Sequence, residues 1–198
     1  MQRIVIVNTG CANISSVRFA LERLGVTVSV SDDHANISRA DKVFLPGVGA
    51  APAAMKSIRE KGLINVIQQL EQPVLGICLG MQLMVESSAE RREGNEPCLA
   101  LMPGHVGRLE ANGQRLPHMG WNTVHHQDDA LFRGIPQDTY FYFVHSFAIP
   151  VYAHTLATCE YGSRFSAAIH NKNFFGVQFH PERSGEAGAQ LLTNFVNL

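Results

Sequence analysis

The segment from Pro73 to Gln82, which reads PVLGICLGMQ, constrains the fold of this 198-residue chain more than any other. Its apolar start, residues 73–77, predicts a short strand buried on both faces, as strands are in a parallel sheet. The strand leads into the pattern Gly-x-Cys-x-Gly at residues 76–80. This pattern is the cysteine form of a nucleophile elbow, a sharp turn from strand to helix that exposes one side chain. We therefore expect a helix to follow over residues 81–85.

Cys78 occupies the exposed position of this expected elbow. The N-terminus of a helix carries partial positive charge, which favours a thiolate over a thiol. The free amide of Leu79 would point to the space beside the sulfur, where it could stabilise an oxyanion. The alternative is that Cys78 is a small core residue, as most free cysteines are.

A candidate base lies near the end of the chain, in the segment FFGVQFHPE at residues 174–182. Its aromatic and β-branched residues predict a strand, and Pro181 would end the pairing of that strand. On an extended backbone His180 and Glu182 would share one face, and a carboxylate beside an imidazole orients it. His180 could then take a proton from Cys78, although a hydrogen-bonded core histidine is an alternative. Together the motifs predict a Cys78–His180–Glu182 triad, in a chain order different from that of α/β-hydrolases.

Composition excludes several other classes of protein. Apolar residues make up 45% of the chain, which, with its length, favours one globular domain over residues 1–198. The net charge is −1, so no basic patch is expected that would bind nucleic acid or an anionic membrane. The apolar run at the start is too short for a signal peptide, and no window approaches a membrane span. The four cysteines lie far apart without metal-ligand spacing. We expect a cytoplasmic protein with reduced thiols, no metal and no cofactor.

The order of predicted elements indicates an α/β fold. The first half alternates strands and helices, which predicts a mostly parallel, doubly wound sheet flanked by helices, with Asn13 as the cap of the first helix. The second half adds short β-strands separated by turn residues. The polar segment 87–97 is interpreted as a solvated loop without a binding role. The expected strands are 4–7, 26–30, 42–45, 106–109, 123–125, 140–146, 155–159 and 165–170, and the expected helices are 13–24, 50–61, 63–70 and 185–198.

Several other motifs leave alternatives open. The turn Pro46–Gly49 (PGVG) lacks the Lys-Ser/Thr ending of a phosphate loop, so it either brings backbone amides to a substrate or is only a tight turn. Trp121 is interpreted as a packing residue or an interface anchor. Three further cysteines, Cys11, Cys98 and Cys159, have neither an elbow nor a partner and carry no expected function. Three further histidines, His118, His125 and His126, have no nearby ligands for a metal site and are placed on the surface or in turns.

The two main motifs, GICLGMQ at 76–82 and HPE at 180–182, resemble the signatures of the class I, or triad, glutamine amidotransferases. The stretches PGVG (46–49), LPHMGWN (116–122) and YFVHS (142–146) are similar to one subfamily, the glutaminase subunits that serve imidazole glycerol phosphate synthesis in histidine biosynthesis. The resemblance extends over essentially the whole chain and shows no departure at a catalytic position. An alternative is a glutaminase subunit of another ammonia-dependent synthase, for example for pyridoxal phosphate or anthranilate.

The resemblance also implies roles for individual residues. Cys78 would attack the side-chain amide of glutamine with the help of His180 and Glu182, and water would then hydrolyse the γ-glutamyl thioester. The Leu79 amide, with an amide of Val48 or Gly49 after a peptide flip, would form the oxyanion hole. The glutamine pocket would be lined by Gly47, Gln82, His145 and Ser146.

The resemblance implies a partner as well. Ammonia would pass to a (β/α)₈-barrel cyclase subunit, which makes imidazole glycerol phosphate and aminoimidazole carboxamide ribotide. Physical chemistry favours such a partner, because ammonia released into neutral water becomes mostly non-nucleophilic ammonium. Other hypotheses are a cysteine hydrolase on a similar elbow and a catalytically silent regulatory subunit. The interface candidates by resemblance are Asn13, Arg18, Trp121, Tyr142 and Arg183.

Overall fold

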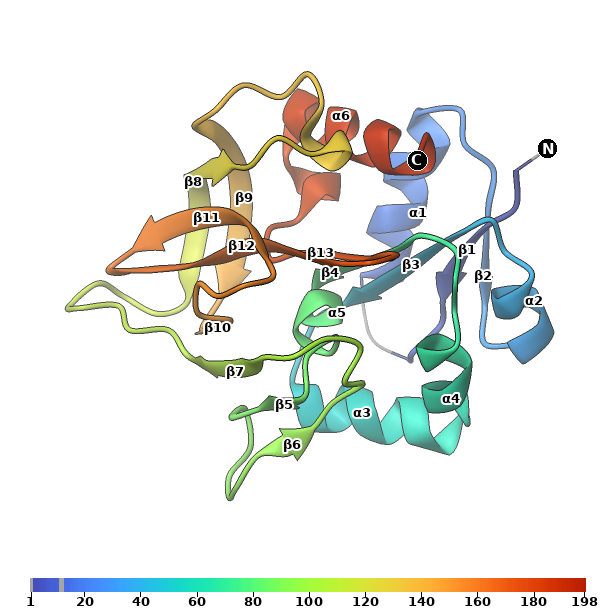
Figure 1. Ribbon diagram of the computed structural model, residues 1–198, viewed down its shortest axis with the longest axis horizontal. Helices are drawn as coiled ribbons and strands as arrows, with labels where there is room; N and C mark the ends of the chain where they lie inside the picture. Colours follow the sequence, from blue (N-terminus) through green and yellow to red (C-terminus); the bar gives the residue numbers. More distant parts are fainter. Residues whose placement is uncertain (1, 11–12) are drawn as a thin grey trace.

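The computed structural model describes residues 2–10 and 13–198, and its centre is a nine-stranded sheet (Figure 1). The strand order is β2-β1-β3-β4-β13-β12-β11-β8-β9. The first five strands in this order are parallel, and the pairs from β13 to β9 are antiparallel. This arrangement confirms the expected α/β class with additional strands in the second half. The strands are β1 (Ile4–Val7), β2 (Val28–Ser31), β3 (Lys42–Gly47), β4 (Val74–Cys78), β8 (His118–His126), β9 (Thr139–His145), β11 (Thr155–Tyr161), β12 (Ser163–Asn171) and β13 (Phe174–Val177).

Helices cover both faces of the parallel half of the sheet (Figure 1). α1 (Ile14–Arg23) and α6 (Gly185–Val196) lie on one face, and α3 (Ala51–Glu60) and α4 (Leu63–Gln68) lie on the other. The alternation of side chains along β1 explains this, because Ile4 and Ile6 pack into one core cluster and Val5 and Val7 into a second. The first cluster also holds Leu21 of α1 and Leu192 of α6. A short helix that the sequence did not predict, α2 (His34–Ser38), is capped by the Asp33 side chain, which accepts from the Asn36 amide at 2.8 Å.

A second, four-stranded sheet has the order β10-β7-β5-β6. It shows that the prediction of a solvated loop over residues 87–97 is wrong at both ends of that segment. Ser88 is fully buried, and Glu96 is buried with its carboxylate paired to Arg59 and Arg91. Within this segment, residues 91–95 and Pro97 are exposed. The strands of this sheet are β5 (Ser87–Ser88), β6 (Glu96–Pro97), β7 (His105–Arg108) and β10 (Phe147–Ala148).

Two predicted helix features differ in the structure. The helix after the elbow, α5, spans only Leu79–Gln82 instead of continuing through Val85. The chain turns away there, and the carbonyls of Leu83 and Val85 accept hydrogen bonds from the returning segment at residues 99–100. Asn13 precedes α1 but does not cap it with its side chain, because its backbone is left-handed (φ 76°) and its side-chain amide points elsewhere.

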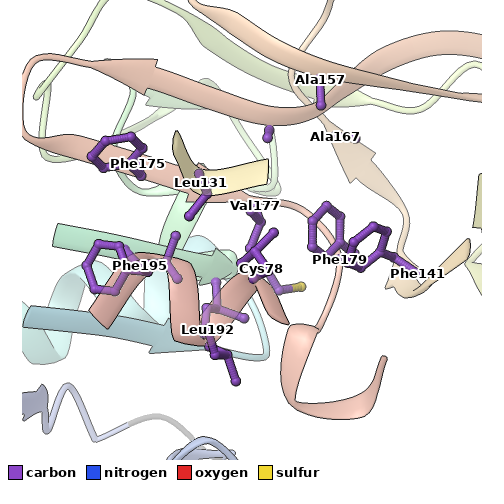
Figure 2. Close-up of a cluster of buried hydrophobic side chains, with 14 of the residues drawn as sticks. Cys78, Leu131, Phe141, Ala157, Ala167, Phe175, Val177, Phe179, Leu192 and Phe195 are labelled. Atoms are coloured by element: carbon purple, nitrogen blue, oxygen red, sulfur yellow. The ribbon is translucent and has the colours of Figure 1, made fainter. Parts of the chain in front are cut away.

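The core between the sheet and α6 is rich in aromatic side chains (Figure 2). Phe141 and Phe179 stack with their ring centroids 4.1 Å apart, and Phe195 meets Phe44 edge to face at 5.0 Å. Cys78 belongs to this cluster and is 7% exposed. Among the described residues, none of the helices has both the length and the apolar character needed to cross a membrane.

Replacing Gly80 with alanine is expected to destabilise the fold by about 3 kcal/mol or more. A Cβ atom at Gly80 would lie 1.7 Å from the carbonyl oxygen of Leu45 in β3, so the elbow and the strand would have to separate. Urea denaturation measures the change in the free energy of unfolding. Gly107→Ala is the matched control, since a Cβ there has no neighbour within 4 Å. A Gly80→Ala protein as stable as this control would contradict the close packing of the elbow.

Candidate active site

The strand-to-helix turn places Cys78 at the carboxyl end of β4. Its backbone has φ 53° and ψ −109°, a conformation that non-glycine residues seldom adopt and that often accompanies a functional site. Gly76 and Gly80 permit the turn, because a Cβ at Gly76 would lie 2.8 Å from the Gly80 carbonyl group. The helix after the elbow, α5, is only four residues long, so its dipole favours the thiolate less than the longer helix expected from the sequence would. The strained turn therefore does more to present the sulfur than the helix does.

His180 and Glu182 lie next to each other, but not for the reason that the sequence suggested. β13 ends at Val177, and Glu182 is in a 3₁₀ turn, η2 (Pro181–Arg183), instead of an extended strand. The turn brings Glu182 Oε1 to 2.7 Å from His180 Nδ1, with the two side chains 0% and 2% exposed. Asn13 Nδ2 donates to the same Oε1 at 2.7 Å. The carboxylate is thus held by two donors, one of which is the imidazole.

The other ring nitrogen of His180, Nε2, is buried and has no hydrogen-bond partner among the described residues. His180 and Cys78 line the same pocket, so Nε2 is the ring nitrogen available to the thiol. Burial alone lowers the pKa of His180, but the nearby Cys78 and the hydrogen-bonded Glu182 carboxylate outweigh burial and raise it. An imidazole with a raised pKa next to a thiol can accept the thiol proton.

Cys78 and His180 open onto a pocket of about 240 Å³. Most residues that the sequence assigned to a substrate site or oxyanion hole line this pocket, namely Val48, Gly49, Leu79, Gln82, His145 and Ser146. Gly47 does not line it but pairs with Cys78 across β3 and β4. A Cβ at Gly47 would lie 3.1 Å from Leu79 Cβ, so this glycine lets the two strand ends approach each other closely.

The turn PGVG places two backbone amides at the pocket. Gly49 has φ 100°, which favours glycine, and the amides of Val48 and Gly49 donate to no backbone carbonyl of the described residues. The Leu79 amide belongs to the residue that follows the nucleophile candidate, the usual source of an oxyanion donor at an elbow. The pocket therefore has the amides from which an oxyanion hole can be built.

Glu90 is a pocket residue that the sequence analysis missed. It lies in the segment interpreted as a solvated loop, yet its side chain lines the same pocket as Cys78. Glu90 Oε2 accepts a hydrogen bond from the Ala51 amide at 3.2 Å, and burial raises the pKa of Glu90. Only its place in a run of charged residues marks Glu90 in the sequence, and that pattern also fits a loop in solvent.

Three of the five interface candidates form one cluster on the outer side of β8 and β9. Trp121 is 55% exposed and meets Tyr142 edge to face at 6.1 Å, and the Arg183 guanidinium lies 4.7 Å from the centre of the Tyr142 ring. Met119 and Tyr140 are also exposed on these strands. The other two candidates lie apart from the cluster: Asn13 contacts Glu182, and Arg18 pairs with Glu22 along α1 at 3.5 Å.

The histidines expected on the surface have different positions. His118 is 2% exposed and contacts His145, so its predicted surface position is wrong. His126 stacks on Phe132, while His125 is exposed as expected.

Cys98 and Cys159 are free, and Cys11 lies outside the described residues. Within the described ranges, His, Cys, Asp and Glu form no group of three that could hold a metal ion.

A strained cysteine elbow at the end of a parallel strand, together with a buried His-Glu pair and a pocket lined by Cys78 and His180, is typical of enzymes that use a cysteine nucleophile. The chain belongs to the class I glutamine amidotransferase family, whose model matches residues 5–198. It is 58% identical over 193 residues to the imidazole glycerol phosphate synthase subunit HisH of Mannheimia succiniciproducens, covering 97% of this chain and 98% of the relative. It is 54% identical over 201 residues to the protein of that name from Vibrio cholerae, covering 100% and 99%.

Solved structures support the fold. A glutamine amidotransferase crystal structure has a TM-score of 0.75 at 18% identity, covering 98% of this chain and 97% of that one. The structure of PurLQS from Thermotoga maritima has a TM-score of 0.73 at 18% identity, covering 99% and 98%. At this level of identity the likeness concerns the fold alone.

Proposed function

We propose that this chain hydrolyses glutamine to glutamate and ammonia, as the glutaminase subunit of an imidazole glycerol phosphate synthase in histidine biosynthesis. The observation that carries the proposal is the placement of Cys78 and His180 at one pocket, with Glu182 bonded to the other side of the imidazole. Identity of 58% to a HisH subunit supports the choice of pathway.

The geometry supports a two-stage reaction. His180 Nε2 accepts the thiol proton, and the Cys78 sulfur attacks the side-chain carbonyl carbon of glutamine to form a tetrahedral oxyanion. His180 then gives the proton to the departing nitrogen, which leaves as ammonia, and a γ-glutamyl thioester remains on Cys78. Water, deprotonated by His180, hydrolyses the thioester and frees glutamate. Glu182 keeps Nδ1 protonated and stabilises the imidazolium in both stages.

Backbone amides support the oxyanion in this proposal. The Leu79 amide and an amide of Val48 or Gly49 are the donors, and the unbonded amides of the PGVG turn are consistent with a peptide that reorients on activation. Gly47, Gln82, His145 and Ser146 shape the glutamine pocket, with Gly47 acting through the close approach of β3 to the elbow.

The ammonia is delivered to a (β/α)₈-barrel cyclase subunit in this proposal. The exposed cluster of Trp121, Tyr142 and Arg183 is the interface we assign, because exposed aromatic and arginine side chains are typical anchors of protein interfaces. Tyr142 also joins this surface to the triad, since its carbonyl accepts from the His180 amide at 2.9 Å. Asn13 and Arg18 complete the assigned interface. We place the complex in the cytoplasm, where the free cysteines stay reduced.

An isotope experiment tests this function. The chain, the cyclase subunit and its phosphoribulosyl-formimino nucleotide substrate are mixed with amide-¹⁵N glutamine in an excess of unlabelled ammonium. We expect ¹⁵N in the imidazole product at nearly the enrichment of the glutamine, since channelled ammonia does not mix with the solvent. Dilution of the label to the solvent ratio would contradict delivery, and the absence of product with this partner would contradict the assigned synthase.

Replacing Glu90 with glutamine is expected to raise KM for glutamine about 10- to 100-fold and to change kcat little. Glutamine carries an α-ammonium group, and the Glu90 carboxylate lies in the pocket where it can accept from that group. The glutamine side chain can still accept from the Ala51 amide, so the loop keeps its position. Steady-state kinetics with the partner present check this effect. Glu93→Gln, at an exposed position of the same segment, is the control. An unchanged KM in Glu90→Gln would refute the assignment.

A further inference from the structure

Two buried glutamine side chains connect the proposed nucleophile to the rest of the pocket wall. Gln178 is fully buried, and its Nε2 donates toward the Cys78 sulfur at 3.7 Å. Gln178 Oε1 accepts from Gln82 Nε2 at 2.9 Å, and the same Nε2 donates to the Phe147 carbonyl at 2.9 Å. The Phe147 carbonyl can only accept, so Gln82 must turn its NH₂ group to it. Gln178 must therefore turn its oxygen to Gln82 and its NH₂ group to the sulfur.

His145 also contacts the Phe147 carbonyl, and His118 in turn contacts His145. His145 Nδ1 lies 2.8 Å from that oxygen and must carry a proton, and His145 Nε2 lies 2.9 Å from His118 Nδ1. Burial lowers the pKa of His145 to about 3 and that of His118 to about 4, so both rings are neutral at pH 7. A neutral His145 has a bare Nε2, and His118 must then donate to it from Nδ1.

The chain of hydrogen bonds ends at Asn122. Its Nδ2 donates to His118 Nε2 at 3.2 Å and to the Glu160 carbonyl at 2.9 Å, while its Oδ1 accepts from the Thr123 amide at 2.8 Å. Because Asn122 donates to His118 Nε2, that ring nitrogen carries no proton, as expected for a neutral His118 that donates from Nδ1. Every donor from Asn122 to His145 has an acceptor, so this arm of the chain donates consistently toward the Phe147 carbonyl, where it meets the donor from Gln82.

We propose that Gln178 is a positioning residue for the Cys78 nucleophile, and that the His118–His145 pair holds in place the Phe147 carbonyl, which orients Gln82 and through it Gln178. The proposal rests on the proposed role of Cys78. The Cys78 sulfur makes two hydrogen bonds. Its thiol donates to the Val144 carbonyl at 3.8 Å, and Gln178 Nε2 donates to the sulfur at 3.7 Å. When the thiol proton moves to His180, the Gln178 N–H still stabilises and aims the sulfur. A reversed Gln178 amide would present an oxygen to that negative charge.

Kinetics of matched variants test the positioning role. Gln178→Glu keeps the shape of the side chain but replaces the donor with an oxygen, and we expect kcat with the cyclase partner to fall about 10- to 100-fold at nearly constant KM. Iodoacetamide labelling of Cys78, followed by peptide mass mapping, is expected to slow at pH 7 to a similar degree. Gln190→Glu on the exposed side of α6 is the control. A Gln178→Glu protein with the kcat and labelling rate of the control would overturn the proposal.

The histidine pair provides a second test that does not require a Gln178 variant to fold. His118 does not line the pocket, so it acts only through His145. His118→Asn can retain a donor near the position of Nδ1, whereas His118→Phe cannot. We expect kcat to fall about 10-fold in His118→Phe and to recover largely in His118→Asn. An equal kcat in the wild type and in His118→Phe would contradict the proposal.

Side-chain ¹⁵N NMR reads the direction of the chain without any catalysis. With ¹⁵N-labelled histidine, His118 and His145 are expected to be neutral at pH 7 and protonated at Nδ1, with each ring assigned by its loss in a substituted protein. A protonated ring, or a proton on Nε2 of either ring, would contradict the proposed direction. If Cys78→Ala still hydrolyses glutamine while the NMR result is as expected, the role of Cys78 fails and not the hydrogen-bond chain.

Discussion

Replacing Cys78 with alanine is expected to lower glutamine-dependent glutamate formation on the order of 10⁴-fold or more. The thioester cannot form without the sulfur, and neither of the other described cysteines, Cys98 and Cys159, lines the pocket. Synthesis by the cyclase from added ammonium salt is expected to continue, since the substitution leaves the partner surface intact. Glutamate release and cyclase product formation are measured separately on the same complex.

The control for this substitution is another cysteine. Burial raises the pKa of Cys98 to about 12, and that thiol lies outside the pocket, so Cys98→Ala is expected to keep full glutaminase activity. A Cys78→Ala complex that still made product from glutamine would revive the hypothesis of a catalytically silent regulatory subunit. Loss of both glutamine- and ammonia-dependent synthesis would indicate damage to the complex and contradict the assigned role.

Replacing Glu182 with glutamine is expected to lower kcat for glutamine hydrolysis about 10³- to 10⁴-fold, with a smaller effect on KM. His180 Nδ1 and Asn13 Nδ2 both lie 2.7 Å from Oε1, so an amide oxygen can take that place and the geometry can persist. What the variant loses is the negative charge that stabilises the imidazolium. Stopped assays of glutamate with the cyclase partner measure the effect. Glu186→Gln, exposed at the start of α6, is the control.

The same variant has an expected effect of pH on stability. A histidine with a folded-state pKa above its unfolded value stabilises the fold at pH values below about 6.5, and this contribution disappears as the pH rises through the raised pKa. Glu182 is one cause of the raised pKa of His180. Glu182→Gln should therefore lose on the order of 1 kcal/mol more stability at pH 6 than at pH 10. Urea denaturation at the two pH values measures this, and an equal loss at both would contradict the coupling.

The elbow and the parallel half of the sheet could be predicted from the sequence because their determinants are local. Residues 73–80 combine a buried strand with two glycines, and no other element accommodates that pattern. The pairing of His180 with Glu182 was predicted, but its geometry was not. The sequence suggested an extended strand, whereas Pro181 starts a 3₁₀ turn that brings Nδ1 to Oε1.

The contacts that the sequence could not reveal are long-range ones. Asn13 looked like a helix cap, but Glu182, 169 positions away along the chain, takes its side-chain amide. The sequence places Glu90 in a charged segment that is typical of a solvated loop. In the structure this segment lies between β5 and β6, and Glu90 lines the pocket. His118 looked like a surface histidine because its neighbours Met119 and Trp121 are indeed exposed. Strand alternation turns His118 inward, and only the pairing of β8 with β9 sets it opposite His145.

The most direct test of the account is glutamate formation from glutamine, measured first with the chain alone and then with the cyclase subunit and its nucleotide ligand. Val48 lies between two glycines in the PGVG turn, and the amides of Val48 and Gly49 make no backbone hydrogen bond that would oppose a peptide flip, so we expect low activity alone. Activity should rise strongly when both partner and nucleotide are present. High activity of the chain alone, unchanged by the partner, would leave a glutaminase with the proposed triad but contradict its coupling to this synthase.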